Sequence, residues 1–220
     1  MQSDNPNLKE LVHTLRHDYL TTTLEKETAR QNPFEQFELW LADAVEKQLY
    51  EPNAMVLSTA TAVGKPSSRV VLLRGFGESG FVFYTNYKSR KGLEIEENPN
   101  AALLFYWAEI ERQVRIEGTI AKINEEDSDA YFASRPRESR IGAWTSPQSC
   151  VIESRDVLEK KFNELARQWK EKSIARPPEW GGYALKPEIF EFWQGRESRL
   201  HDRLLYTKVK SDWKIERLAP

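Results

Sequence analysis

The sequence predicts a mainly β protein of the α+β class, in which a β-barrel carries several helices. Short runs rich in β-branched and aromatic residues recur with the two-residue period of strands between residues 54 and 123, and again between residues 182 and 217. Helical periodicity is confined to the segments before and between these two regions. The chain has 220 residues, 40% of them hydrophobic, which is enough for one well-buried domain.

The N-terminal part divides into two segments. Residues 1–31 are polar and show only a weak helical pattern, so we expect a mobile N-terminal arm there and a single domain over residues 32–220. The domain begins with an expected helix that runs to about Tyr50. Asn32 is a favourable N-cap residue, and Pro33 suits the first helical position.

Eight strands are expected after this helix. In residues 111–123, Val114, Ile116 and Ile120 alternate with polar side chains, a pattern typical of half-buried antiparallel strands. The first two strands flank a Gly-Lys-Pro turn and therefore predict a hairpin. The expected strands are Ala54–Thr61, Ser67–Arg74, Phe81–Thr85, Ala101–Trp107, residues 111–123, Gly182–Trp193, Leu200–Val209 and Trp213–Arg217.

Two helical segments lie between the two groups of strands, near residues 125–134 and 154–172. The Arg-Pro-Pro sequence at residues 176–178 breaks the second pattern, because proline lacks the amide hydrogen that a helix interior needs. The chain is therefore expected to return to strands soon after these prolines.

Composition and motifs argue against several classes of protein. The formal net charge of −2 gives no support to a nucleic-acid-binding protein. The single cysteine, Cys150, excludes an internal disulfide and a thiolate metal cluster, and the three histidines lack metal-ligand spacing, so no metal is expected. No apolar run approaches about 18 residues, and the N-terminus lacks a signal-peptide pattern. We therefore expect a cytoplasmic protein without a membrane partner.

One glycine motif is interpreted as a turn. Gly75 to Gly80 match G-x-G-x-x-G, which in a dinucleotide-binding fold leads from a strand into a helix. Here a strand-like run, Phe81-Val-Phe-Tyr-Thr, follows the glycines. The motif therefore predicts a hairpin turn.

Cationic and polar clusters at predicted strand ends and loops carry the functional signal. Arginine and lysine bind phosphate well, arginine as a planar bidentate fork. Each cluster alone is typical of a solvated surface, but so many of them in a chain without net positive charge predict two phosphorylated ligands. The clusters are Arg69 with Arg74, Ser89-Arg90-Lys91, Glu111-Arg112-Gln113, Ser134 to Ser139, Gln148-Ser149 and Arg199 to Arg203.

Spacing gives two expectations about these side chains. Tyr131, Arg135 and Ser139 are four residues apart, so they project from one side if the segment is one helix. Arg69 and Arg74 stand at the two ends of an expected strand segment, where side chains alternate, so they should point to opposite faces.

The order of motifs closely resembles the pyridoxine 5′-phosphate oxidases. The matching segments are R-V-V-L-L, F-Y-T-N, S-R-K, E-R-Q-V, S-R-P-R-E-S-R-I-G-A-W, Q-S and F-W-Q-G-R-E-S-R-L-H-D-R, followed by W-K-I-E-R-L-A-P. The resemblance as a whole runs from about residue 10 to the C-terminus. The resemblance implies a split β-barrel in which two subunits form two flavin mononucleotide (FMN) sites at their interface. It implies oxidation of pyridoxamine or pyridoxine 5′-phosphate to pyridoxal 5′-phosphate, with oxygen as acceptor and hydrogen peroxide as by-product.

The same resemblance implies roles for individual residues. FMN would be bound by Arg69, Val70, Val71, Leu72, Leu73, Arg74, Tyr84, Thr85, Arg90, Lys91, Gln113, Gln148, Ser149, Trp193 and Arg203. The substrate phosphate would be held by Arg74, Tyr131, Arg135 and Ser139. The substrate ring would lie under Arg199, Leu200 and His201, with Arg199 and His201 as the catalytic pair. Arg16 and Tyr19 of the arm match a stretch that contacts ligand in the family. Nothing in the sequence fixes the identity of a general base.

Two residues depart from the common family pattern, and three other classes of protein remain as alternatives to the family. Arg74 stands where lysine is common and Glu51 where aspartate is common, so the charge is kept while the length of the side chain changes.

The alternative classes are a split-barrel flavoprotein reductase with another substrate, a non-catalytic pyridoxal phosphate carrier and a nucleic-acid-binding barrel.

Overall fold

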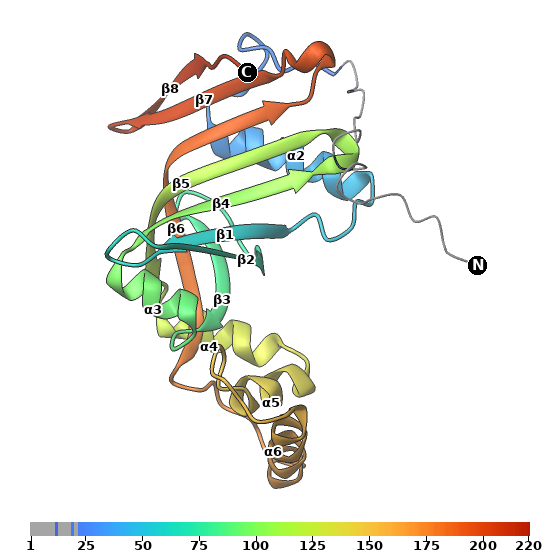
Figure 1. The fold of residues 1–220 in the computed structure, drawn as a ribbon, viewed down its shortest axis with the longest axis vertical. Helices are drawn as coiled ribbons and strands as arrows, with labels where there is room; N and C mark the ends of the chain where they lie inside the picture. The colour runs from blue at the N-terminus through green and yellow to red at the C-terminus, as the bar shows by residue number, and fades with distance from the viewer. Residues whose placement is uncertain (1–11, 13–18, 20–21) are drawn as a thin grey trace, which may run out of the picture.

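A computed structural model describes Val12, Tyr19 and residues 22–220. The molecule is elongated, with the strands in its upper and middle part and the helices α4, α5 and α6 at the end opposite to β7 and β8 (Figure 1). In the described ranges, every helix is too short or too polar to cross a membrane.

The first helix of the domain is α2, Pro33–Glu46. The Asn32 side chain accepts a hydrogen bond from the Phe34 N–H (2.9 Å), and Pro33 takes the first helical position, as the sequence predicts. The apolar stripe of this helix, with Phe37 fully buried, covers the barrel core.

The eight predicted strands are all found, and every strand pair is antiparallel. Their order in the sheet is β2-β1-β4-β5-β6-β7-β8, and β3 pairs with β6. The strands are β1 (Ala54–Ala60), β2 (Pro66–Leu72), β3 (Phe81–Asn86), β4 (Asn100–Trp107), β5 (Arg112–Lys122), β6 (Trp180–Gln194), β7 (Asp202–Val209) and β8 (Asp212–Arg217). The predicted α+β fold with a β-rich barrel is confirmed.

Strand β6 is long and pairs with two different strands, β3 and β7, along one edge. Trp180–Leu185 pair with β3 and Ile189–Gln194 pair with β7, while β5 follows the other edge past both halves. The change of partner falls at Pro187, which has no N–H to donate to a ladder. The β5–β6 register shifts at the same level, where Gly118 lets the backbones approach closely, because a Cβ there would collide with the Lys186 carbonyl oxygen. The barrel is therefore split along β6.

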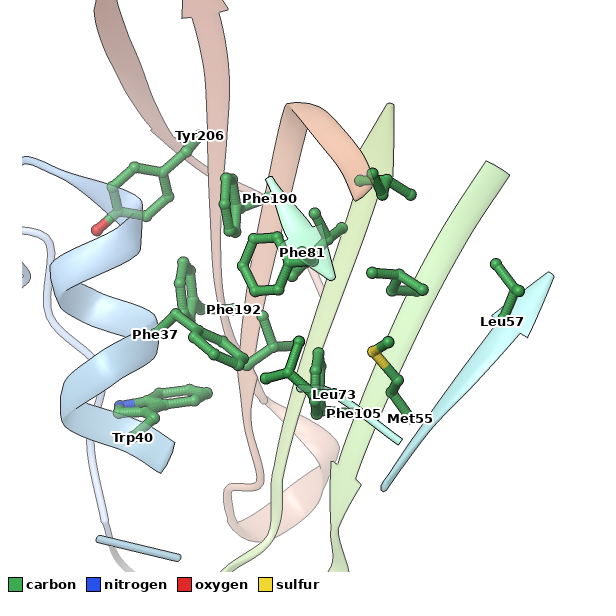
Figure 2. Packing of buried hydrophobic residues seen from close by; sticks show 14 of the residues in the cluster. Phe37, Trp40, Met55, Leu57, Leu73, Phe81, Phe105, Phe190, Phe192 and Tyr206 are labelled. Atoms are coloured by element: carbon green, nitrogen blue, oxygen red, sulfur yellow. The ribbon is translucent and has the colours of Figure 1, made fainter. Parts of the chain in front are cut away.

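Aromatic and aliphatic side chains fill the barrel (Figure 2). Phe37 of α2 lies 5.0 Å from Phe81 and 4.9 Å from Phe105, measured between ring centroids. Each such side chain contributes about 1.5–3 kcal/mol when fully buried. Because the interior is filled in this way, ligand-binding side chains must lie at the ends of the strands or on the outer face of the sheet.

The remaining helices include two that the sequence did not predict. The helices are α3 (Arg90–Glu97), α4 (Glu125–Ser134), α5 (Arg137–Thr145) and α6 (Arg155–Gln168). Helices α3 and α5 were missed, since eight or nine residues give too few turns for an apolar period to stand out. Helices α4 to α6 share a second core, made of Phe132, Ile141, Leu165, Ile174 and Trp180.

The condition that one helix carries Tyr131, Arg135 and Ser139 is not met. Helix α4 ends at Ser134, and Arg135 has extended backbone (φ −71°, ψ 148°) before Pro136. Proline disfavours helical backbone in the residue that precedes it. The three side chains therefore leave from α4, a linker and α5, and not from one helical face.

The expected strand Ser67–Arg74 is two residues too long at its C-terminal end. Strand β2 stops at Leu72, and Arg74 lies in the connection to β3, where its N–H donates to the Val82 carbonyl (2.8 Å). Alternation within one strand therefore does not decide where Arg74 points. Residues 75–80 form the predicted turn, with Gly80 at φ +119°.

Residues 22–31 pack on the domain. Leu24 is buried, its N–H donates to the Asp202 carboxylate (3.1 Å), and its carbonyl accepts from Arg217 (3.0 Å). This described part of the expected arm thus rests on β7 and β8.

Candidate active site

Three cations gather where β2, β3 and the start of α3 meet. Ser89 caps α3 by accepting from the Gly92 N–H (3.3 Å), which places Arg90 and Lys91 in the first turn. Arg69 reaches the same place from β2, near enough for its charge to lower the pKa of Lys91. The start of a helix also favours an anion, through its unpaired N–H groups. We call Arg69, Arg90 and Lys91 the cation cluster.

Lys91 connects this cluster to a distant loop. Its Nζ donates to Gln148 Oε1 (2.9 Å) and to Thr85 Oγ1 (3.2 Å), and Thr85 also donates to Gln148 (3.0 Å). Burial, with the charge of Arg69, lowers the pKa of Lys91 to about 8. Gln148 thus joins the predicted phosphate-end residues, and its neighbour Ser149 is exposed with left-handed backbone (φ 71°).

A buried acid lies beneath the cations. Glu94 Oε2 accepts from the hydroxyls of Thr59 and Ser67 and from Arg69 Nη2 (3.3 Å), and Glu94 Oε1 accepts from Arg90 Nε (2.8 Å). Burial alone would raise the pKa of Glu94, but these hydrogen bonds outweigh it and lower the pKa to about 2. The carboxylate is therefore ionised at neutral pH.

A second group, here called the Tyr84 cluster, combines aromatic rings with arginines. Tyr84 stacks on Tyr131 (ring centroids 3.8 Å apart) and on Trp180 (5.6 Å), and the Arg135 guanidinium lies 4.6 Å over Trp180. Arg135 Nη1 is buried without a hydrogen-bond partner. Burial lowers the pKa of Arg135, and the charge of nearby Arg74 acts in the same direction. A buried N–H of this kind is satisfied when an anion binds.

The two groups lie on either side of β3. Tyr84 and Thr85 are neighbours in this strand, so their side chains point to opposite faces. Thr85 contacts Lys91, and Tyr84 contacts Tyr131. Two groups of cationic side chains are therefore one strand apart. Ser139, expected in the second of them, is half-buried on α5.

A third group, the C-terminal cluster, lies at the end of β6 and the start of β7. The rings of Trp193 and His201 are 4.7 Å apart, and the Tyr19 ring packs edge-on at 4.8 Å from His201. Arg199 and Leu200 are exposed, and Arg199 has left-handed backbone (φ 61°). The other expected arm residue, Arg16, lies outside the described residues.

The hydrogen bonding of His201 fixes its tautomer. Nδ1 accepts from the Arg196 N–H (3.1 Å), so the neutral ring carries its proton on Nε2. Burial and the charge of Arg199 lower the pKa of His201, which favours this neutral form. At neutral pH the side chain therefore presents a hydrogen-bond donor, not a free base.

Arg203 is held by a second buried acid. Glu191 Oε1 accepts from Arg203 Nε (2.8 Å), and Glu191 Oε2 accepts from Arg115 Nη2 (2.6 Å). The hydrogen bond to Glu191 raises the pKa of Arg203. The Arg203 guanidinium is thereby fixed beside Trp193, its partner in the β6–β7 register.

The register places several expected flavin contacts on one face of the sheet. Residues opposite each other in antiparallel strands share a face. Across β4 to β7 this row contains Tyr106, Gln113, Trp193 and Arg203. In β2, Val70 is 63% exposed on this outer face, whereas the alternate residues Arg69 and Val71 pair with buried Leu57 and Met55. Leu73 is also buried. Of the run from Val70 to Leu73, Val70 and Leu72 therefore remain for contact with a ligand on the outer face.

One chain does not bring the Tyr84 and C-terminal clusters together. Tyr84 pairs with Gly182, near the start of β6, whereas Trp193 lies near its end. At about 3.3 Å per residue, these positions are roughly 35 Å apart along the strand. Residues that the sequence grouped into one flavin site thus lie in separate parts of the chain.

Several residues of these groups were not predicted, among them Glu94, Glu191 and Trp180. Glu94 follows Arg90 by four residues, a spacing that signals an ion pair on a helix, but α3 itself was missed. Glu191 and Trp180 belong to ordinary strand alternation, and no local signal marks them. Within the described ranges, no three His, Cys, Asp or Glu side chains are arranged to hold a metal ion.

A split antiparallel barrel with cationic clusters on either side of β3 is the architecture that the resemblance to pyridoxine 5′-phosphate oxidases implies, and comparison with known proteins agrees. Residues 41–169 match the family model of pyridoxamine 5′-phosphate oxidase, and residues 180–220 match that of the pyridoxine 5′-phosphate oxidase C-terminal dimerisation region. The chain is 56% identical to a pyridoxine/pyridoxamine 5′-phosphate oxidase of Rubrobacter xylanophilus, over 94% of this chain and 95% of the relative. It is 57% identical to the enzyme of the same name from Burkholderia mallei, over 94% and 97%.

Solved structures give the same result. PhzG from Burkholderia lata, solved with tetrahydrophenazine-1-carboxylic acid, superposes with a TM-score of 0.85 at 33% identity, covering 91% of this chain and 99% of that one. An FMN-binding protein from Nostoc punctiforme superposes with a TM-score of 0.68 at 19% identity, covering 86% and 98%, and shows the shared fold. The chain belongs to the pyridoxamine 5′-phosphate oxidase family.

Proposed function

We propose that the protein is an FMN-dependent oxidase that converts pyridoxamine and pyridoxine 5′-phosphate to pyridoxal 5′-phosphate, with oxygen as electron acceptor and hydrogen peroxide as by-product. The two anion-binding groups on either side of β3 carry the proposal, because cofactor and substrate each bear a phosphate. Membership of the family and relatives named for this activity support the same reaction.

The cation cluster fits the phosphate end of FMN. Arg69, Arg90 and Lys91 converge at the start of α3, and repulsion between Arg69 and Lys91 would be relieved by a phosphate dianion. Gln148 and Ser149 extend this site from the loop after α5. When bound, FMN would supply the redox chemistry that links oxidation of the substrate to reduction of oxygen, while these residues would hold its phosphate end.

The Tyr84 cluster is suited to the substrate phosphate. Arg135 offers a buried unpaired N–H, Arg74 lies near it, and the Tyr131 hydroxyl can donate. Ser139 would complete the site from α5. We assign to Arg199 and His201 the orientation of the substrate ring, with His201 Nε2 as a hydrogen-bond donor.

We propose a cytoplasmic homodimer in which each flavin site takes residues from both chains. The separation along β6 between the Tyr84 and C-terminal clusters supports this arrangement, as does the match of residues 180–220 to a dimerisation region. The outer face of the sheet would form the interface, since Val70 and Tyr106 are more than 60% exposed there. A single cysteine fits a reducing compartment.

Anaerobic reduction tests the reaction. Pyridoxamine 5′-phosphate added to the FMN-loaded protein without oxygen should bleach the flavin, and air should restore the colour with release of hydrogen peroxide. A flavin that stays oxidised with this substrate, but is bleached by tetrahydrophenazine-1-carboxylic acid, the compound bound in the PhzG structure, would contradict the proposed substrate.

Mixed dimers test the shared site. Lys91→Ala and Arg203→Ala should each be nearly inactive alone. If the site combines the cation cluster of one chain with Arg203 of the other, a mixed dimer has one site without either substitution. Activity should then return when the two variants are unfolded and refolded together. No recovery from two folded, dimeric variants would contradict the shared site.

A further inference from the structure

Glu94 lies at the centre of the cation cluster without an assigned role. Its side chain is 5% exposed, on the second turn of α3. Burying a carboxylate is unfavourable unless donors and cations compensate for the lost water. Here two hydroxyls and two arginines do so.

The hydroxyls of Thr59 and Ser67 link Glu94 to Arg69 through hydrogen bonds whose donors and acceptors are defined. Thr59 and Ser67 each donate to Glu94, and each accepts from the Arg69 guanidinium. Arg69 Nη1 also donates to the Leu57 carbonyl (3.2 Å). The terminal nitrogens of Arg69 are thereby held by protein acceptors, and its Nε–H is left for a ligand.

Arg90 is held in the complementary way. Its Nε donates to Glu94, so both of its terminal nitrogens remain for a ligand, and its side chain is 58% exposed. One carboxylate thus sets the orientation of two guanidinium groups. It also places a negative charge among three cations that otherwise repel each other.

We propose that Glu94 is a positioning residue that orients Arg69 and Arg90 to receive the phosphate of the flavin nucleotide. The inference rests on the proposed function, because it takes the cation cluster as the phosphate end of the FMN site. It predicts that Glu94 contributes to recognition of the phosphate and not of the flavin ring.

The test compares two ligands that differ only in the phosphate. The dissociation constants of FMN and riboflavin are measured on the full-length, flavin-free protein by quenching of flavin fluorescence. Glu94→Gln should weaken FMN binding by about tenfold or more, the effect of disturbing charge-assisted hydrogen bonds, and leave riboflavin within about twofold.

Two further variants keep the test decisive. Ser67→Ala removes one bridge between Arg69 and Glu94, and should give a smaller loss confined to FMN even if Glu94→Gln fails to fold. Asp43→Asn is the matched control, since Asp43 also pairs with two cations, Arg112 (2.5 Å) and Lys47 (2.6 Å), away from the cation cluster. It should leave the ratio of the two constants unchanged.

The outcomes separate the inference from the proposed function. Wild-type protein that binds FMN no more tightly than riboflavin would contradict the phosphate site itself. If the wild type prefers FMN, but Glu94→Gln and Ser67→Ala leave that preference unchanged or weaken both ligands equally, the positioning role is overturned. Loss confined to FMN supports it.

Discussion

Glu94 and Glu191 are buried carboxylates in two regions of the molecule, and each is compensated by arginine side chains. Each is a buried carboxylate, with side-chain exposures of 5% and 4%, and each bridges two arginines. The partners of Glu94 come from β1, β2 and its own helix, and include two hydroxyls. The partners of Glu191 come from the neighbouring strands β5 and β7, and Arg115 among them is 43% exposed on the outer face.

This difference separates two kinds of site. Both carboxylates are paired within one chain, but residues 41–169, which contain Glu94, match the oxidase model. The Glu191 region lies in the match to the dimerisation region, on a face that carries exposed apolar side chains. We therefore expect the first region to govern affinity for phosphate and the second to govern turnover.

Removing the substrate phosphate should have the largest effect. Several charge-assisted hydrogen bonds, each contributing about 1.5–3 kcal/mol, should make kcat/KM for pyridoxamine at least about 1000-fold lower than for its 5′-phosphate. Steady-state kinetics on the FMN-loaded protein measure the ratio. Comparable kcat/KM values for pyridoxamine and its 5′-phosphate would contradict the proposal that the Tyr84 cluster binds the substrate phosphate.

Arg199→Ala should lower kcat/KM by about 100-fold, because a cation over the substrate ring is lost. FMN affinity should stay within about twofold, since the cation cluster is untouched. Arg155→Ala, an exposed arginine on α6, is the matched control. If Arg199→Ala lost FMN binding while the remaining holoenzyme turned over normally, the C-terminal region would govern cofactor affinity and not turnover.

Arg74→Ala should raise KM for pyridoxamine 5′-phosphate by about tenfold and spare FMN affinity, since one charged contact to the substrate phosphate is removed. Arg74→Lys should cost less, because it keeps the charge while losing the planar fork. Initial rates over a range of substrate concentrations distinguish these cases. A KM within about twofold of wild type for Arg74→Ala would mean that this exposed arginine merely connects β2 and β3.

The smallest effect should be on the pH dependence of FMN binding. Lys91 is protonated below its lowered pKa of about 8 and loses its charge as the pH rises through that value. The dissociation constant for FMN should therefore increase about fivefold from neutral to mildly alkaline pH, while that for riboflavin stays level. Lys91→Arg should remove the pH dependence, as arginine stays charged. A parallel change for both ligands would show that Lys91 does not meet the phosphate.

The strands were predictable, and the shorter helices were not. Alternation is a local signal, so all eight strands were found within a few residues of their ends. Helix α3 has only eight residues, so its apolar period spans too few turns to stand out in the sequence. The break at Arg135 could have been predicted, because Pro136 follows it.

The candidate site residues came from resemblance, but their grouping required the structure. The contact of Gln148 with Lys91 depends on where the loop after α5 runs, and no local pattern encodes that path. The tautomer of His201 depends on one backbone N–H of the preceding turn. The distance between Tyr84 and Trp193 follows from strand register, which alternation alone does not fix.

The shared edge of β6 also constrains how the chain folds during synthesis. Phe81–Asn86 have β6 as their strand partner, and β6 begins about a hundred residues later, a separation typical of slowly folding topologies. A nascent chain leaves the ribosome from its N-terminus, so β3 emerges with an unpaired edge and with Phe81 and Phe83 unburied. The hairpin of β1 and β2 can form early, but the barrel closes only after β6 has been made. During about half of its synthesis, the nascent chain therefore exposes an aromatic strand that is prone to aggregation.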